Sequence, residues 1–206
     1  MMRKAISLFV FLASVMLLSA TVAAAAPDNF NGIGYTSTYE QYPDFIRGVP
    51  IPDGKPSAEE EREYARTALS FHRGAEKVAG LPVGSVFYIF DNETNLFSSL
   101  SFCVSFYNEA KSLKVESVDY SLNKQPYYRV IAPLGEADRY FSSIYDYFVK
   151  EYGEPSEKKD KNSAAWTLFD PGVHIHLYLA DAFGKDKALW LNILKMDFPP
   201  EAEIFL

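Results

Sequence analysis

The sequence predicts an α+β protein, built from a mainly antiparallel sheet with one long helix packed on one face. The first observation is the segment Leu96–Tyr107, where apolar and small polar residues alternate with a period of two, as in a half-buried antiparallel strand. The apolar positions are Leu100, Phe102, Val104 and Phe106, and the opposite face carries Ser99, Ser101, Cys103 and Ser105.

The second observation is an amphipathic stretch at Glu136–Tyr152. Its apolar residues recur at helical spacing, and Gly153 and Pro155 follow where a helix should end. We expect its stripe to pack on the apolar face of the 96–107 strand; the stripe comprises Ala137, Phe141, Ile144, Phe148 and Tyr152. Ser57 and Glu60 have capping-box spacing, which predicts a shorter N-terminal helix over about 58–69.

The third observation is a series of short strand-like segments in hairpin order, which favours an antiparallel sheet. Asp170-Pro171-Gly172 forms the turn between two of them, and the charged run Glu157–Lys161 is expected to be a loop. The expected strands cover residues 69–73, 86–90, 114–120, 127–132, 165–169, 173–179 and 188–196.

The beginning of the chain has the layout of a secretory signal peptide at 1–25. Arg3 and Lys4 precede an apolar run at 6–18, and small residues follow up to an expected cut after Ala25. Residues 26–56 are rich in proline and glycine and predict an irregular arm, and 57–206 is expected to be a single α+β domain. The protein is therefore expected to be exported, to the periplasm or the extracellular space.

Composition narrows the range of partners. The full chain has a net charge of −7, and removal of the two leader cations leaves −9, which argues against nucleic acid as a partner. The apolar run is too short to span a bilayer, no later segment approaches the needed length, and no cysteine near the cut could carry a lipid anchor. The single cysteine fits a bacterial exported protein better than a disulfide-rich one.

One pair of side chains could bind a metal. His174 and His176 are two residues apart on an expected strand, so both rings should lie on one face, as nitrogen ligands of zinc or copper do. Cys103 could add a thiolate if its strand lies nearby, whereas a structural role is expected for His72. The alternative is a solvated sheet face with no cofactor, which we favour because only two ligands are evident.

A resemblance agrees with this fold class. The residues that carry the similarity are Phe30-Asn31-Gly32-Ile33, the segment 86–90 followed by Leu96-Phe97-Ser98, the helix end Tyr152-Gly153-Glu154-Pro155 and the late Trp166. In these segments the sequence is similar to small exported bacterial α+β proteins with no assigned function. The resemblance implies an envelope setting and carries over no catalytic residue.

Three functions follow as hypotheses. The first is a non-enzymatic binding or accessory protein of the bacterial cell envelope, which binds an envelope protein or a small ligand. The second is a metal-binding protein or metallo-hydrolase that uses His174 and His176. The third is a protein inhibitor or assembly factor that is recognised through a sheet edge or through Ile204-Phe205-Leu206.

Overall fold

A computed structural model describes residues 26–47, 69–119, 126–182 and 186–196. Its main sheet comprises β3 (Ile46–Arg47), β4 (Leu69–His72), β7 (Phe87–Phe90), β8 (Phe97–Tyr107), β9 (Lys114–Asp119), β10 (Pro126–Pro133), β11 (Glu157–Asp160), β12 (Ser163–Leu168), β13 (Val173–Asp181) and β14 (Lys187–Lys195). Two small hairpins are formed by β1 (Asn29–Phe30) with β2 (Ile33–Gly34) and by β5 (Glu76–Val78) with β6 (Leu81–Gly84). The helices are α3 (Ala137–Tyr152) and the 3-10 turns η1 (Tyr39–Gln41) and η2 (Leu134–Glu136).

The fold class is confirmed in its main features. The strand order is β11-β12-β13-β14-β8-β7-β4-β3, and every pair along this path is antiparallel. The departure is β10, which pairs in parallel with the second half of β8 and antiparallel with β9. This pairing is possible because β7 occupies only the first half of that edge of β8.

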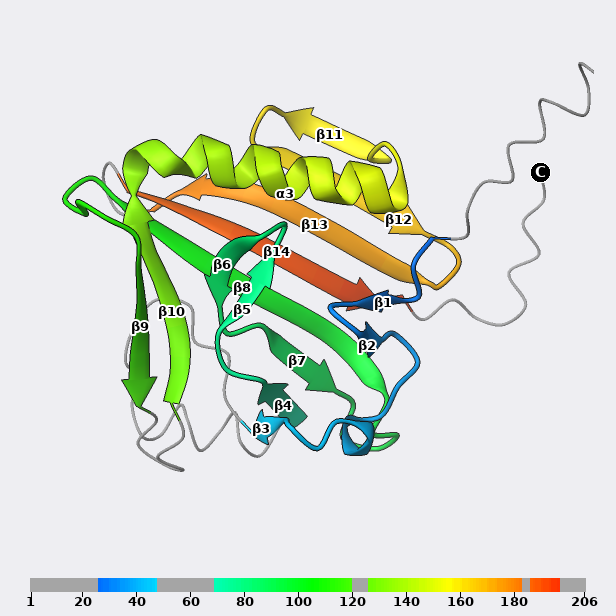
Figure 1. Ribbon diagram of the computed structural model, residues 1–206. Helices are drawn as coiled ribbons and strands as arrows, with labels where there is room; N and C mark the ends of the chain where they lie inside the picture. Colours follow the sequence, from blue (N-terminus) through cyan, green and yellow to red (C-terminus); the bar gives the residue numbers. More distant parts are fainter. Residues whose placement is uncertain (1–25, 48–68, 120–125, 183–185, 197–206) are drawn as a thin grey trace, which may run out of the picture.

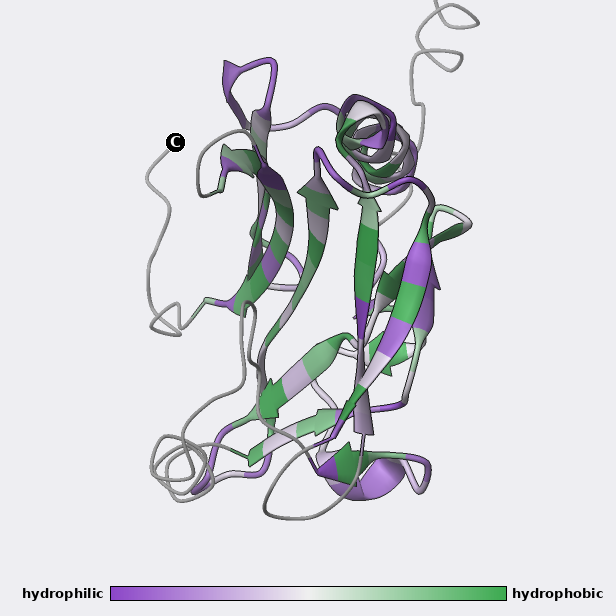
Figure 2. Cartoon of the chain, turned by 90° about the vertical axis from the view of Figure 1, so that its left-hand side faces the viewer, coloured by the Kyte–Doolittle hydropathy of each residue, from purple (hydrophilic) through white to green (hydrophobic). Residues whose placement is uncertain are grey.

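The long helix packs on the sheet face that carries the apolar residues of β8, as expected, and it lies mainly over β13 and β14 (Figures 1 and 2). The residues of α3 that are buried in this core are Ala137, Tyr140, Phe141, Ile144 and Phe148. They share one cluster with Leu100, Phe102, Val104 and Phe106. The helix begins one residue after the expected start, and it ends at Gly153, whose positive φ of 82° lets the chain turn away.

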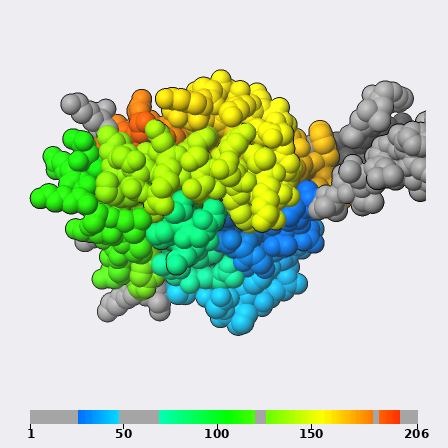
Figure 3. Space-filling model, turned by 45° about the horizontal axis from the view of Figure 1, so that its top comes forward, coloured from blue at the N-terminus to red at the C-terminus, as the bar shows by residue number. Residues whose placement is uncertain are grey.

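The segment before β3 packs against the C-terminal half of the helix. Phe30 stacks on Phe148 with 6.1 Å between ring centroids, and the hydroxyls of Tyr35 and Tyr152 are 3.0 Å apart. Tyr152 also donates to the carbonyl of Asn29. Figure 3 shows α3 as a ridge bordered by this blue segment on one side and by β11 on the other. Over 26–47 the arm is thus more regular than predicted, since it contains the β1–β2 hairpin.

The β5–β6 hairpin was not predicted from the sequence. It covers the N-terminal half of the helix, where the Tyr140 hydroxyl donates to the carbonyl of Pro82. Its last residue leads to Ser85, whose N–H donates to the carbonyl of Tyr128 at 2.7 Å. The Ser85 hydroxyl accepts the N–H of Tyr128 at 3.0 Å and donates to the carbonyl of Gly74. Ser85 therefore links the residues just before β7 to the first half of β10 by hydrogen bonds.

Glu157–Lys161 was expected to be a loop, but residues 157–160 form the edge strand β11, with all four charged side chains exposed. The prediction was wrong because an edge strand needs no apolar face when its partner supplies the hydrogen bonds. The expected N-terminal helix, apart from Leu69 in β4, and the signal peptide lie outside the described residues. No helix in the described part of the chain could cross a membrane.

We expect Phe148→Ala to lower the free energy of unfolding by about 3–5 kcal/mol, because it removes a fully buried ring from the centre of the core. Ser101→Ala, on the other face of the sheet, should change it by no more than about 0.5 kcal/mol. Urea unfolding of both variants measures the difference. Equal midpoints would contradict the assignment of the two faces.

We expect Gly84→Ala to be far more damaging than Gly80→Ala, although both glycines lie in the same hairpin with φ near +79° and +76°. At Gly80 a methyl group meets nothing within 4 Å, so only the backbone strain of about 1–2 kcal/mol applies. At Gly84 the methyl carbon would lie 2.4 Å from the carbonyl oxygen of Tyr128, which adds about 1–3 kcal/mol of overpacking. Similar melting temperatures for the two variants would show that β6 can move away from β10.

Candidate functional site

The candidate site lies on the sheet face opposite α3, called here the open face. On β13 it carries His174, His176 and Tyr178, which alternate with residues buried in the core. On β14, Trp190 lies directly across from Tyr178. All four rings are half-buried. We call this set, His174, His176, Tyr178 and Trp190, the ring ladder.

Successive rings of the ladder lie within contact range. The ring centroids are 6.5 Å apart for the two histidines, 4.7 Å for His176 and Tyr178, and 6.5 Å for Tyr178 and Trp190. The last pair is nearly parallel, with 12° between the ring planes. The histidine pair was anticipated from the sequence. Trp190 was missed, although the alternation of β14 contained the signal for it.

Hydroxyl groups on β12 hold both imidazoles. Thr167 Oγ1 is 3.1 Å from His174 Nδ1, and Ser163 Oγ is 3.2 Å from His176 Nε2. Burial, followed by the nearby charges of His174 and Lys159, lowers the pKa of His176 below its ordinary value. The neutral ring is therefore favoured at position 176, and a neutral imidazole can both donate and accept a hydrogen bond.

Cys103 does not join the histidines. It lies on β8 opposite Trp190, and the whole width of β14 separates it from β13. Two strand spacings amount to about 10 Å, whereas a zinc–sulfur bond is about 2.3 Å. Among the described residues there is no group of three His, Cys, Asp or Glu side chains that could hold a metal ion.

A cavity of about 410 Å³ opens beside the ladder at the β11–β12 side of the sheet. This volume lies within the range of small-ligand sites. Its wall contains two rings of the ladder together with hydroxyl, amide and charged groups. The lining residues are Lys159, Asp160, Asn162, Ser163, His176, Tyr178, Leu179 and Asp181. Sequence reasoning did not find this cavity, because the strand β11 that borders it was expected to be a loop.

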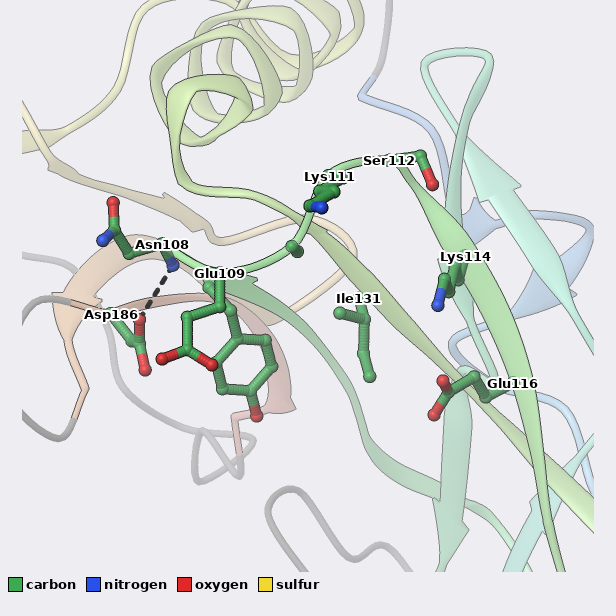
Figure 4. A pocket seen from close by; sticks show the side chains of 10 residues that line it. Asn108, Glu109, Lys111, Ser112, Lys114, Glu116, Ile131 and Asp186 are labelled. Atoms are coloured by element: carbon green, nitrogen blue, oxygen red, sulfur yellow. Dashed lines mark hydrogen bonds between the residues drawn. The ribbon is translucent and has the colours of Figure 1, made fainter.

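A second cavity of about 770 Å³ lies at the other end of the same face, beside the connection from β8 to β9 (Figure 4). Ile131 in its wall is paired in register with Ser105 of the open face. Figure 4 shows Lys114 and Glu116 on one side of this cavity and Asp186 on the other. Two of its acids already have partners, since Glu116 binds Arg129 at 3.0 Å and Asp186 accepts the N–H of Asn108.

The third histidine has a different environment. His72 is 0% exposed in β4, and its Nδ1 accepts the N–H of Gly74 at 3.2 Å. Its Nε2 and the Oγ of Ser70, on the same side of the strand, are buried and have no hydrogen-bond partner among the described residues. Burial lowers the pKa of His72 to about 4. A structural role fits this buried position.

Comparison of the chain with protein-family models, with curated proteins and with solved structures found no match.

We expect stability to fall as the pH is lowered from 6.5 to 4, because of His72. Its pKa is lower in the folded chain than in the unfolded chain, so the unfolded state binds the proton first. The contribution is complete above pH 6.5 and is lost by pH 4, at a total of about 3 kcal/mol. Denaturant unfolding across this pH range should show that the free energy of unfolding falls less steeply with decreasing pH in His72→Asn than in the wild type. The asparagine keeps a hydrogen-bond acceptor for the N–H of Gly74. The control Ser70→Ala should keep the wild-type slope, and parallel curves for all three proteins would contradict the assignment.

Proposed function

We propose that this chain is an exported, non-enzymatic binding protein of the bacterial cell envelope and that its ligand binds on the open face. The observation that carries the proposal is the ring ladder, three half-buried rings along β13 and a fourth beside them on β14, next to a cavity of ligand size. Rings with a partly exposed surface and a polar end are common at recognition sites. The leader-like order of residues 1–25 supports export.

The position of the site in the fold supports this function. The core residues of β8, β13 and β14 share one core with α3. The strands that carry the ladder are therefore held in place by packing on their opposite face. Side chains on such strands keep their positions when a ligand arrives, which limits the entropy lost on binding. Leu194, which is 50% exposed next to His174, adds apolar surface to the same face.

The sheet edge is a weaker candidate for recognition. At β11 the edge strand consists of Glu157, Lys158, Lys159 and Asp160, all exposed. Charged residues on an edge strand oppose the addition of a further strand. The alternative recognition element, Ile204-Phe205-Leu206, lies outside the described residues.

The proposal is tested in two steps in cells that produce the chain. Fractionation and N-terminal sequencing should find a mature protein that begins at Ala26 outside the cytoplasm. The purified mature protein should then sediment with the isolated cell envelope. A cytoplasmic species that retains Met1, or a mature protein that stays in the supernatant, would contradict the proposal.

A matched pair of variants locates the binding surface. Leu194→Asp places a charge on the open face and should reduce the sedimented fraction about tenfold, since an unpaired charge in an interface costs at least ~1.4 kcal/mol. Val115→Asp makes the same change at a residue that is 43% exposed and whose partner in register, Val130, is buried in the core. Val115→Asp should bind normally, and equal losses would show that binding does not use the open face.

A further inference from the structure

We infer that the cavity beside the ring ladder is a binding site for a neutral saccharide, one of whose sugar rings lies against Tyr178 in the cavity wall and extends over Trp190, the neighbour of Tyr178 on β14. The inference rests on the proposed function and names the ligand class of that site. It is drawn from three features of the cavity: partly exposed aromatic rings, a dense set of hydrogen-bonding groups, and nearly balanced charges.

The aromatic rings suit the apolar side of a sugar. Tyr178 and Trp190 are nearly parallel and 6.5 Å apart, near the outer limit of about 7 Å for ring–ring contact, and both remain half-buried. Their π surfaces are therefore only partly used within the protein. The face of an aromatic ring is electron-rich, so it attracts the weakly positive C–H groups on one side of a pyranose.

The polar groups suit the hydroxyls of a sugar. Ser163 and His176, 3.2 Å apart, can each donate or accept, and the carboxylate of Asp181 accepts at the rim. The Asn162 amide offers both functions beside them. A saccharide carries a hydroxyl on nearly every carbon, and this mixture of donors and acceptors can satisfy several of them at once.

The backbone that carries these groups is fixed. The carbonyl of Asn162 accepts the N–H of Leu179 at 2.8 Å, and its own N–H donates to Asp160 Oδ1 at 2.7 Å. The turn between β11 and β12 is thus tied to β13 on one side and to its own strand on the other. Groups held in this way lose little freedom when a ligand binds.

The charges favour a neutral ligand. Lys159 is the one cation in the wall of the cavity, and it stands against Asp160 and Asp181. Asp160 is already engaged with the N–H of Asn162. A phosphate or uronate would meet an excess of one negative charge in the wall, and Lys159 offsets most of the attraction that the two carboxylates would have for an amine.

The experiment uses the fluorescence of the purified mature protein. The chain has two tryptophans: Trp190 stacks beside Tyr178, which lines the cavity, and Trp166 is 1% exposed in the core. Titration with the neutral disaccharides cellobiose, maltose and di-N-acetylchitobiose should change the emission with at least one of them. The change should persist in Trp166→Phe and disappear in Trp190→Phe, because only Trp190 reports on the open face.

Calorimetry of the same disaccharide then tests the named residues. Trp190→Ala and Asp181→Asn should each lower the affinity about tenfold, the equivalent of ~1.4 kcal/mol for a stacking or hydrogen-bonding group. Asp146→Asn is the matched control, since Asp146 is exposed on α3, which covers the opposite face of the sheet. The control should bind as tightly as the wild type.

The outcomes distinguish the inference from the proposed function. If no neutral disaccharide binds while Leu194→Asp still reduces sedimentation with the envelope, the proposed function stands and the saccharide inference is wrong. Tighter binding of digalacturonate or of choline than of every neutral sugar would also overturn it. If both the sugars and the envelope fail to bind, the proposed function fails as well.

Discussion

The two-faced character of β8 is the constraint on which the rest of the structure depends. The strand has 11 residues and pairs with β14 on one side and with β7 and β10 in turn on the other. Leu100, Phe102, Val104 and Phe106 point into the core that α3 shares, and Ser99, Ser101, Cys103 and Ser105 point away from it. A shift of one residue in its register would exchange these faces, and every strand paired to it would follow.

This constraint separates stability from recognition. The large apolar side chains of β8, β13 and β14 lie in one core with α3, together with the rings of the N-terminal segment. The open face contributes little to that core, so its side chains are free to differ in size and polarity. The cavity beside the ring ladder and the cavity beside β9 both occur there. Substitutions on this face can change binding while leaving the core intact.

The parts of the fold that sequence reasoning could predict are those with long local patterns. The stripe of α3 and the alternation of β8 extend over many residues, so chance agreement is small. The same alternation placed His174 and His176 on one face. The strands of the β5–β6 hairpin are only three and four residues long, too short for a clear alternation of apolar and polar residues. Its turn contains Ala79 and Gly80, both with positive φ. Asn31-Gly32 in the other small hairpin is a strong turn signal that could have been used.

The remaining features of the fold and of the candidate site depend on contacts between segments that are distant in the sequence, and no local pattern contains this information. The parallel position of β10 follows from the length of β8 that β7 leaves unpaired, and from Ser85, which joins Tyr128 across 43 residues of sequence. The candidate site is assembled in the same way, since Trp190 meets Tyr178 only after β13 and β14 pair, and Ser163 reaches His176 only after β12 joins them. Sequence spacing could therefore propose a pair of histidines. Only the register of three strands brings four rings together, with the hydroxyls of β12 and a cavity on one side of them.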